Sequence, residues 1–465
     1  MKNTASGMNE NFDYDVIVVG GGPGGAIAAF TLAKAGYNVC ILDKKKRERI
    51  GDKTCGDALD KATVDLLKKE IGIDEPQGDE VSDIISKMSI AANNIETKAT
   101  LTAPGYVVDR LNYGQRLLKD CEEAGVTVIS QAPVRDIIIE NEFLKGVKFY
   151  HEGETKELRA KFTIDASGSY AAIRSRLPES MRFGNIIEKD LKPSMVWPTY
   201  REIIELNEEK TPHPWLGEII LLYEREIPIP GYFWIFSKGP NRLNVGLGWL
   251  KTEKNQPPLK KALRKELEKY YKEEDYRVIR SGGGQIPIRP PFDTLVFDGG
   301  ALVGDAGCLV HPTTAEGHGP ALESGFYCAK AMIKALEKED YSHKAIWQYN
   351  LDIMHHLGEK HANALLIREF LEKVGADSLE FLLKKRFLTN DDLDKLVRGQ
   401  AVQLSLGEKI KRLLRIFPIW SPVFHLVKLL RKSEEVRKHY LAYPKEPDHL
   451  EEWRKMRNSI TGWGF

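Results

Sequence analysis

The sequence predicts an α/β fold with an α+β insert, composed of a Rossmann-like nucleotide-binding domain, a β-sheet substrate domain and a helical C-terminal region. Three observations support this prediction. An apolar run at 14–19 leads directly into a glycine-rich turn and an alanine-rich helical stretch. Strand-like segments dominate 190–285, and the last third of the chain is rich in helix-compatible sequence.

Length and composition describe an ordinary globular protein. The 465 residues are enough for two or three domains of roughly 150 residues each. Hydrophobic residues make up 42% and charged residues 29%, which argues against wholesale disorder. The net charge of +1 provides no global basic field, so we expect no nucleic-acid partner.

The five cysteines indicate a reducing environment. Their number is odd and no pair has CxxC spacing, which argues against a disulfide framework, a zinc site or an iron–sulfur cluster. The N-terminal segment lacks the apolar core of a signal peptide, and no run of about 18 apolar residues occurs. We therefore expect a cytoplasmic protein without a membrane span.

The first βαβ unit carries a dinucleotide-binding motif. A buried strand at Tyr14–Val19 is followed by Gly20, Gly22 and Gly25 in GxGxxG spacing, then by a helix predicted from Ala26 to about Ala35. These glycines permit a tight turn, close approach of a pyrophosphate and close helix–strand packing, respectively. Asp43 ends the next strand, 18 positions after Gly25, where a carboxylate accepts hydrogen bonds from a ribose. The complete unit predicts a bound dinucleotide but leaves NAD and FAD open.

Two later strands favour a flavin. The segment TIDASGS (163–169) and the segment ALVGDAG (301–307) each end in small residues, which suit backbone packed against an extended cofactor. Asp305 is placed to accept hydrogen bonds from ribityl hydroxyls. The helix that starts near 317–319 would direct its positive end at the flavin pyrimidine.

In these motifs the chain resembles the flavoprotein group that includes para-hydroxybenzoate hydroxylase. The glycine-rich motif, the middle motif and the late "GD" motif occur in the same order, although Ala166-Ser167-Gly168 replaces the usual Asp-Gly of the middle motif. The run YVVDR (106–110) also matches, and the resemblance implies that Arg110 and Arg116 lie near the cofactor. The Rossmann-like domain is thus expected to be an FAD-binding domain.

Two further stretches resemble the geranylgeranyl reductase family, particularly the archaeal enzymes that saturate the isoprenoid chains of membrane lipids. RIGDKTCGDA (49–58) matches the family's Cys-Gly beside the flavin with Cys55 and Gly56. PGYFWIFSKG (230–239) matches its aromatic signature, with Ser237 where Pro is usual. LAYPKEP (441–447) is similar to its tail, so the resemblance covers almost the whole chain.

The resemblance implies an FAD-dependent reductase that saturates geranylgeranyl chains of archaeal-type lipid precursors. The aromatic side chains Tyr232, Trp234 and Phe236 are expected to contact substrate. Together with the motifs above, it predicts cofactor contacts from Gly20, Gly22, Pro23, Gly24, Gly25, Asp43, Lys44, Cys55, Gly56, Arg110, Arg116, Val134, Asp165, Gly168, Gly304, Asp305, Gly317, His318 and Gly319. The predicted domains are 12–80, 105–185 and 286–340 for FAD, 81–104 and 190–285 for the substrate sheet, and 341–465 for the helical region.

Reduction of an isolated alkene needs a hydride from flavin N5 and a proton from a separate donor. Cys55 is our candidate catalytic proton donor, because a free thiol is mostly protonated at neutral pH. A buried, inert thiol is the alternative. The alternation of Tyr232, Trp234 and Phe236 would equally suit one face of a core strand in a protein without flavin.

Two other functions share parts of these patterns. A flavin monooxygenase or halogenase would have the same FAD motifs, but the halogenase signature Trp-x-Trp-x-Ile-Pro is not matched. A non-enzymatic lipid carrier would not need the FAD motifs. No second GxGxxG unit is evident, which leaves ferredoxin, NAD(P)H and small dithiols open as electron donors.

The segment 405–438 is a candidate peripheral membrane contact on the inner face of the cell membrane. Between Glu408 and Lys438, nine Lys and Arg stand against three Glu, mixed with large apolar residues. A helix pair packed on the protein's own core is the alternative. His355, His356 and His361 lack the carboxylate spacing of a di-iron site, so no metal is expected.

Overall fold

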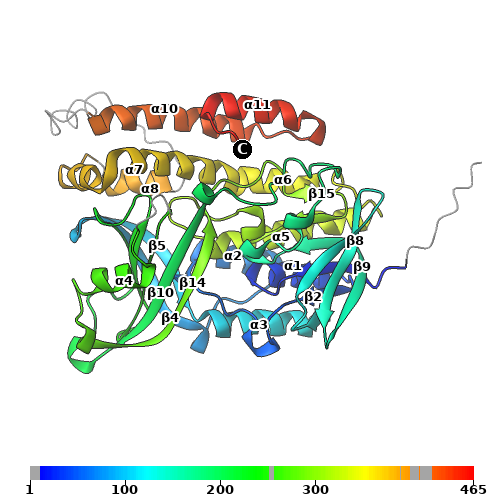
Figure 1. The fold of residues 1–465 in the computed structure, drawn as a ribbon, viewed down its shortest axis with the longest axis horizontal. Coiled ribbons are helices and arrows are strands. Elements are labelled where there is room, and N and C mark those ends of the chain that lie inside the picture. The colour runs from blue at the N-terminus through cyan, green and yellow to red at the C-terminus, as the bar shows by residue number, and fades with distance from the viewer. Residues whose placement is uncertain (1–10, 251–255, 388, 398–407, 409–420) are drawn as a thin grey trace, which may run out of the picture.

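The computed structural model describes residues 11–250, 256–387, 389–397, 408 and 421–465. Two large sheets lie side by side, and helices cover them in layers (Figure 1). The predicted α/β class with a Rossmann-like domain, a sheet domain and a helical C-terminal region is confirmed.

The first sheet is the Rossmann-like sheet. Its strand order is β15-β16-β9-β1-β2-β6, and β1 pairs in parallel with both β2 and β9. Its strands are β1 (Tyr14–Val19), β2 (Val39–Leu42), β6 (Thr127–Ile129), β9 (Glu154–Asp165), β15 (Val296–Phe297) and β16 (Gly300–Leu302), with β7 (Val134–Glu140) and β8 (Phe143–His151) joined through β9. The apolar residues of β1 are buried, as expected for a parallel strand covered on both faces.

Three main helices belong to this domain: α1 (Pro23–Lys34), α3 (Arg110–Glu123) and α5 (His318–Leu336). α1 begins at Pro23, three residues before the predicted start at Ala26. Gly22 is the N-cap, and proline suits the first helical position because its missing N–H would be unpaired there. α5 begins within the predicted 317–319 segment.

The second sheet has the order β14-β10-β13-β12-β11-β4-β5-β3 and is antiparallel except where β11 pairs with β4. Its strands are β3 (Ala58–Asp60), β4 (Val81–Ala92), β5 (Asn94–Val108), β10 (Val196–Leu206), β11 (Glu218–Tyr223), β12 (Tyr232–Ser237), β13 (Arg242–Gly248) and β14 (Tyr276–Pro287). α2 (Lys61–Ile71) follows β3. α4 (Leu259–Leu267) covers the outer face of this sheet.

Side chains of β12 alternate between two apolar clusters. Tyr232 and Trp234 belong to the large core shared with the Rossmann-like domain. Phe233 and Ile235 belong to a smaller core that contains Leu263 of α4. The period-two pattern therefore orients the predicted aromatic face toward the first domain.

The C-terminal region is helical, as predicted. It contains α6 (Trp347–Ile353), the π-helical turn η9 (Met354–Gly358), α7 (Glu359–Lys384), α8 (Asn390–Val397), α10 (Ser421–Leu441) and α11 (Leu450–Thr461). Short helical turns elsewhere are η1 (Arg47–Arg49), η2 (Gly78–Glu80), η3 (Gly168–Tyr170), η4 (Arg174–Arg176), η5 (Pro193–Met195), η6 (Glu208–Lys210), η7 (Glu273–Asp275), η8 (Gly304–Gly307) and η10 (Pro447–His449). α10 and α11 lie over α7, at the top of the view (Figure 1).

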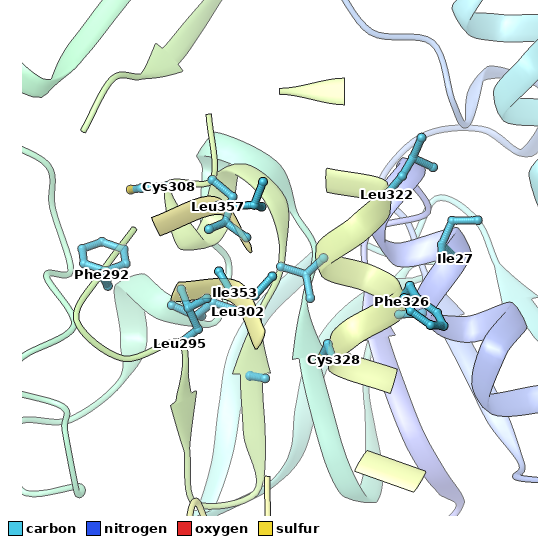
Figure 2. Close-up of a cluster of buried hydrophobic side chains, with 14 of the residues drawn as sticks. Ile27, Phe292, Leu295, Leu302, Cys308, Leu322, Phe326, Cys328, Ile353 and Leu357 are labelled. Carbon is cyan, nitrogen blue, oxygen red and sulfur yellow. The ribbon is translucent and has the colours of Figure 1, made fainter. Parts of the chain in front are cut away.

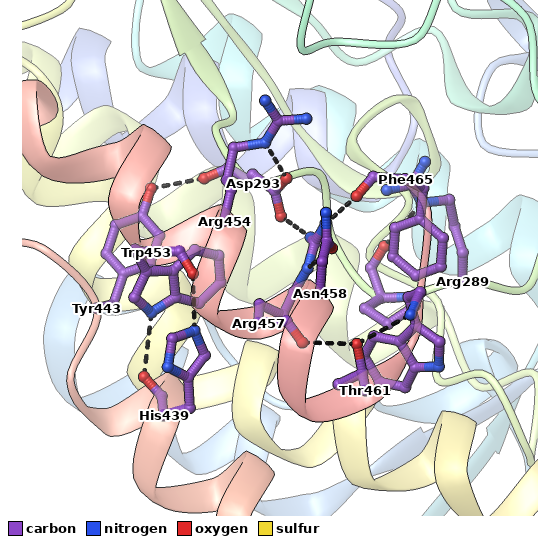
Figure 3. A network of polar contacts seen from close by, with 12 residues as sticks. Arg289, Asp293, His439, Tyr443, Trp453, Arg454, Arg457, Asn458, Thr461 and Phe465 are labelled. Atoms are coloured by element: carbon purple, nitrogen blue, oxygen red, sulfur yellow. Dashed lines mark hydrogen bonds and ion pairs between the residues drawn. The ribbon is translucent and has the colours of Figure 1, made fainter.

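A buried carboxylate fastens the last helix to the rest of the molecule. Asp293 accepts hydrogen bonds from Arg454 (2.7 Å) and from the fully buried Arg457 of α11 (Figure 3). The Tyr443 hydroxyl donates to the Asp293 carbonyl at 2.6 Å. The C-terminal helix therefore docks through charge-assisted hydrogen bonds as well as apolar contact.

The five cysteines are all free. Cys308 and Cys328 lie within an apolar cluster that joins α5 to α6 and η9 (Figure 2). Burial raises the pKa of the Cys308 thiol to about 11. These two thiols therefore act as small apolar side chains.

Candidate functional site

The glycine-rich loop between β1 and α1 shows why its glycines are spaced as they are. Gly20 has φ +108°, and a Cβ there would lie 2.4 Å from the Ala166 carbonyl oxygen. A Cβ on Gly25 would lie 2.0 Å from the Gly20 oxygen. At Gly22 a Cβ would meet no heavy atom within 4 Å, so the backbone there is open to a ligand.

Two helix N-termini meet at this loop. Neither α1, capped by Gly22, nor α5, capped by Gly317, receives a capping hydrogen bond from a side chain of the described residues. The helices pack closely near these ends, because a Cβ on Gly24 would lie 2.6 Å from the Ala321 oxygen of α5. Unpaired N–H groups and two helix dipoles make this region a ready site for anionic or carbonyl groups.

A small pocket opens between the loop, α1, α3 and the start of α5. It is lined by Gly21, Gly22, Pro23, Ala26, Gly51, Arg110, Tyr113, Gly114, Leu117 and His318. His318 is 6% exposed, and neither ring nitrogen has a hydrogen-bond partner among the described residues. Burial, with help from Arg110, holds the pKa of His318 well below its usual range. A neutral, unpartnered ring beside two uncapped helices fits a polar cofactor such as FAD.

The three predicted acidic residues have different surroundings. Asp43 accepts hydrogen bonds from the N–H groups of Gly21 and Lys45, both at 2.8 Å, and so orders the glycine loop. Asp305 is 8% exposed and forms an ion pair with Lys53 at 2.6 Å. Sequence reasoning missed Lys53, although it lies in the Cys-Gly segment.

Asp165 is fully buried and shapes its own loop. Its two carboxylate oxygens accept hydrogen bonds from Ser167, from the Ile173 N–H and from the Arg174 N–H. These contacts fold the Ala-Ser-Gly turn that lies against Gly20. The structure thus gives Asp165 a supporting position behind the glycine loop.

The two predicted arginines of α3 have different surroundings. Arg110 is 5% exposed and lines the pocket. Arg116 is paired with Glu80 (3.1 Å) and Asp120 (3.0 Å), and its guanidinium stacks on Tyr113. Its charge is therefore balanced by two neighbouring acidic side chains.

Two other predicted contacts do not line the pocket. Lys44 is exposed, with its Nζ 4.6 Å from the centre of the Tyr170 ring. Val134 is buried at the start of β7, paired with Phe149 of β8.

The Cys-Gly loop and the aromatic strand β12 are in direct contact. A Cβ on Gly56 would lie 2.4 Å from the Phe236 ring, so only glycine leaves room for that ring. Asn244 donates to the Cys55 carbonyl at 2.8 Å across 189 residues of sequence, and accepts from the Trp234 indole N–H at 3.1 Å. The two segments that carried the family resemblance thus form one site.

Cys55 lies among groups that control its proton. Its Sγ lies 3.1 Å from Asp57 Oδ1, to which the thiol can donate. The same sulfur accepts from Arg110 (2.9 Å) and from the Asp57 N–H (3.2 Å). Burial raises the pKa of Cys55, while Arg110 acts in the opposite direction. The thiol is therefore held protonated, yet a thiolate at this position would be stabilised at once by the guanidinium.

A buried ion pair supports this loop. Asp57 and Lys238 have side chains 3% and 6% exposed, and Lys238 Nζ lies 3.0 Å from Asp57 Oδ2. The same oxygen accepts from Asn244 at 2.9 Å. Sequence reasoning missed all three residues as site elements, although Asp57 and Lys238 each lie inside a quoted motif.

The predicted substrate residues form a continuous, largely buried aromatic cluster. Ring centroids of Tyr232 lie 5.7 Å from Tyr223, 5.8 Å from Trp197 and 6.3 Å from Trp234. Trp234 and Phe236 follow at 6.5 Å. Such edge contacts build a rigid apolar wall.

Two hydrogen bonds fix the ends of this strand. The Tyr232 hydroxyl donates to the Thr314 carbonyl, in the loop that precedes α5. Ser237, which stands where the family pattern has Pro, donates to the carboxylate of Asp83 in β4. The serine at this position therefore adds a hydrogen bond between β12 and β4.

Among the described residues, no group of three His, Cys, Asp or Glu side chains is placed to hold a metal ion. Within the same part of the chain, no helix is both long and apolar enough to cross a membrane.

Two family models match parts of the chain. Residues 15–195 match the family model of glucose inhibited division protein A, and residues 218–286 match that of the geranylgeranyl reductase catalytic domain. A geranylgeranyl bacteriochlorophyll reductase-like structure from Thermoplasma acidophilum superposes with a TM-score of 0.72 at 24% identity, covering 90% of this chain and 99% of that one. The flavin-dependent brominase Bmp2 superposes with a TM-score of 0.66 at 16% identity, covering 91% and 99%. These structures show the same fold.

Sequence relatives are more specific. The digeranylgeranylglycerophospholipid reductase of Sulfolobus acidocaldarius is 30% identical over 96% of this chain and 97% of its own length. The digeranylgeranylglycerophospholipid reductase 1 of Methanococcoides burtonii is 30% identical over 79% of this chain and 86% of its own length. The chain therefore belongs to the digeranylgeranylglycerophospholipid reductase family.

Proposed function

We propose that this protein is an FAD-dependent oxidoreductase that saturates the double bonds of geranylgeranyl chains in archaeal-type membrane lipid precursors. Family membership supports the reaction class. The observation that carries the proposal is the contact between the Cys55–Gly56 loop and the aromatic strand β12, beside the two uncapped helix N-termini.

FAD, when bound, supplies the hydride. The protein's own residues would bind the cofactor, hold the substrate and supply the proton. Gly22 and the first turn of α1 would hold the pyrophosphate, and the first turn of α5 would face the pyrimidine. The aromatic wall around Tyr232 and Trp234 would hold the prenyl chain and exclude water from the reacting carbons.

We assign the proton donated to the alkene to the Cys55 thiol. Its proton is retained by burial, and the thiolate left after donation is met by Arg110 at 2.9 Å. Asp57 fixes the sulfur through its own N–H, and the Lys238 ion pair fixes Asp57.

An anaerobic turnover assay tests the reaction. The purified yellow protein is reduced with dithionite and offered geranylgeranyl diphosphate or an unsaturated di-ether lipid, while flavin reoxidation and product mass are followed together. Reoxidation with a mass gain of two hydrogens per step is expected. Reduced flavin that ignores the alkenes but forms a hydroxylated or halogenated product in O₂ would instead establish the monooxygenase or halogenase alternative.

Cys55→Ala and Cys55→Ser in the same assay test the proton donor. Loss of the thiol is expected to slow the alkene-dependent reoxidation by about 10²-fold, since general acid catalysis contributes roughly 10²–10⁴. A Cys55→Ala protein that turns over as fast as the parent would remove Cys55 from the mechanism.

The electron donor, the cellular location and the membrane contact are also proposals. We infer that the electrons come from reduced ferredoxin or NAD(P)H, and that the protein works in the cytoplasm at the inner face of the membrane. Residues 405–438 are the proposed lipid contact. Of these, 405–407 and 409–420 lie outside the described residues, and the rest belongs chiefly to α10. Sedimentation with anionic vesicles, compared with neutral ones, measures this contact.

A further inference from the structure

Arg201 is a buried arginine of β10 whose charge has no partner. The residue is 2% exposed. Its Nε and Nη1 atoms have no hydrogen-bond partner among the described residues, and it forms no ion pair within that part of the chain. A guanidinium stays protonated in proteins, and a buried charge without a counterion is unfavourable. A ligand that supplies acceptor oxygens would balance this charge.

Arg201 lies on the side of the sheet that faces the Rossmann-like domain. Side chains alternate along β10: Ile204 belongs to the smaller core on the outer side, whereas Trp197 belongs to the large core. Arg201 is four residues after Trp197 and therefore shares its side. The Trp197 indole N–H is also buried without a partner among the described residues. Two buried donors that lack acceptors thus share one face of the sheet.

Glycines on both neighbouring strands leave the sheet beside Arg201 bare of side chains. Arg201 pairs with Gly246 of β13 and with Gly282 of β14. On the β13 side, the Trp234 ring covers the glycine, because a Cβ there would lie 2.2 Å from the indole. On the β14 side, a Cβ on Gly284 would meet a single atom, at 3.6 Å. The strip of sheet between Trp234 and β14 therefore has room for a ligand.

This strip begins at the edge of the sheet. β14 is the edge strand, and Gly282 and Gly284 are both partly exposed. Thr54, directly before Cys55, lies over the first of them, because a Cβ on Gly282 would be 2.6 Å from the Thr54 hydroxyl. A ligand that enters over these glycines passes beside the Cys55 loop before it reaches the guanidinium.

Basic side chains outnumber acidic ones along this edge. Asp52 forms ion pairs with both Arg49 and Arg280, so it balances only one of the two positive charges. Glu205 is likewise shared by two arginines, one from β13 and one from β14. The edge therefore retains positive charge, which attracts anionic ligands.

We propose that Arg201 binds the phosphate of the prenyl substrate and so selects phosphate-bearing lipids over neutral prenyl compounds. The inference rests on the proposed function, because it takes the prenyl chain to lie along the aromatic wall. Two strand spacings, about 10 Å, separate the backbones of Arg201 and Trp234. A phosphate at the guanidinium therefore places the attached chain against that wall. Phosphate fits this position because its oxygens accept several charge-assisted hydrogen bonds from one guanidinium.

Equilibrium binding to the oxidised holoenzyme tests the assignment without turnover. Geranylgeranyl monophosphate, geranylgeraniol and inorganic phosphate are titrated against the parent and Arg201→Met, with tryptophan fluorescence as the readout. The parent should bind the prenyl phosphate at least about tenfold more tightly than the alcohol, because only the phosphate forms charge-assisted hydrogen bonds. Arg201→Met should lose this difference and bind the alcohol as the parent does. Arg201→Lys should retain part of it.

Arg264→Met is the matched control. Arg264 of α4 lies on the outer side of the same sheet, where it pairs with Glu202, the neighbour of Arg201, at 3.2 Å. The control removes the same charge from the opposite side and should leave all three affinities unchanged.

Thermal unfolding of the FAD-loaded proteins is a second readout. Arg201→Met should melt at or above the temperature of the parent, because it removes a buried charge that no described residue balances. A clear fall in Tm would show that Arg201 has a stabilising partner within the protein, which overturns the inference.

The outcomes separate this inference from the proposed function. A parent that saturates the lipid, with full prenyl phosphate affinity in Arg201→Met, overturns the inference and leaves the function standing. A parent that binds the phosphate through Arg201 but never saturates alkenes overturns the function alone. Loss of FAD or a shifted flavin potential in Arg201→Met, with unchanged lipid affinity, assigns the guanidinium to the cofactor and overturns the inference. Inorganic phosphate that binds as tightly as the prenyl phosphate shows a site for free anions, which also overturns it.

Discussion

Replacing Asp57 by Asn should destabilise the fold by removing one charge of a buried ion pair. Lys238, 6% exposed, would keep only the Val108 carbonyl (3.0 Å) and a neutral amide as partners. Breaking a buried pair in this way costs about 3–5 kcal/mol, because an uncompensated charge is left behind. Asn is the appropriate replacement since Asp57 has φ +73°, a conformation that Asn tolerates. Backbone strain therefore does not contribute.

The assay is urea unfolding of the holoenzyme followed by tryptophan fluorescence, in a double-mutant cycle. Asp57→Asn and Lys238→Met alone should each lower the free energy of unfolding, and the double variant should recover most of the loss. A cost below about 1 kcal/mol for Asp57→Asn would contradict the calculation. A double variant no more stable than Asp57→Asn would also contradict it, since the penalty would then not come from the stranded lysine.

Three further predictions concern packing and pH. Gly25→Ala should give protein purified without flavin absorbance, because the new Cβ would lie 2.0 Å from the backbone oxygen of Gly20; a yellow variant would contradict this. Gly246→Ala should displace the Trp234 indole, 2.2 Å from the new Cβ, at a cost of about 1–3 kcal/mol; turnover of a prenyl lipid should fall while FAD content stays constant. Burial lowers the pKa of His311 from 6.5 to about 4. The stability linked to its neutral form is complete above pH 6.5 and is lost as pH falls toward 4, by up to about 3 kcal/mol. Urea midpoints between pH 7 and 4 should therefore fall more steeply in the parent than in His311→Asn.

Local patterns predicted much of the molecule. The strand at 14–19 and the face taken by Tyr232 and Trp234 follow from hydrophobic periodicity. The glycine loop could be predicted because its glycine spacing reflects short-range steric limits. At Gly25, for example, a side chain would collide with the backbone of Gly20.

Long-range polar partners could not be predicted in this way. Lys238 and Asp57 are 181 residues apart, and Lys53 and Asp305 are 252 apart. The residues that flank a buried, paired lysine in the sequence do not differ from those that flank an exposed one. Its partner is distant in sequence, and only the tertiary structure brings the two together. The same holds for Asp165. An acidic residue that follows a buried strand can either bind a ligand or accept hydrogen bonds from its own loop, and the sequence does not distinguish the two.

The segment 55–60 connects the two halves of the molecule. Asp57 ties it to Lys238 and Asn244 of the substrate sheet. Three residues later, Asp60 contacts Thr63 beside the first turn of α5 in the Rossmann-like domain. The intervening strand β3 pairs with β5 of the second sheet, so a shift of Cys55 would move both polar networks together. The contacts of Asp57 with the substrate sheet and of Asp60 with the Rossmann-like domain are therefore positioned by the same three-residue strand.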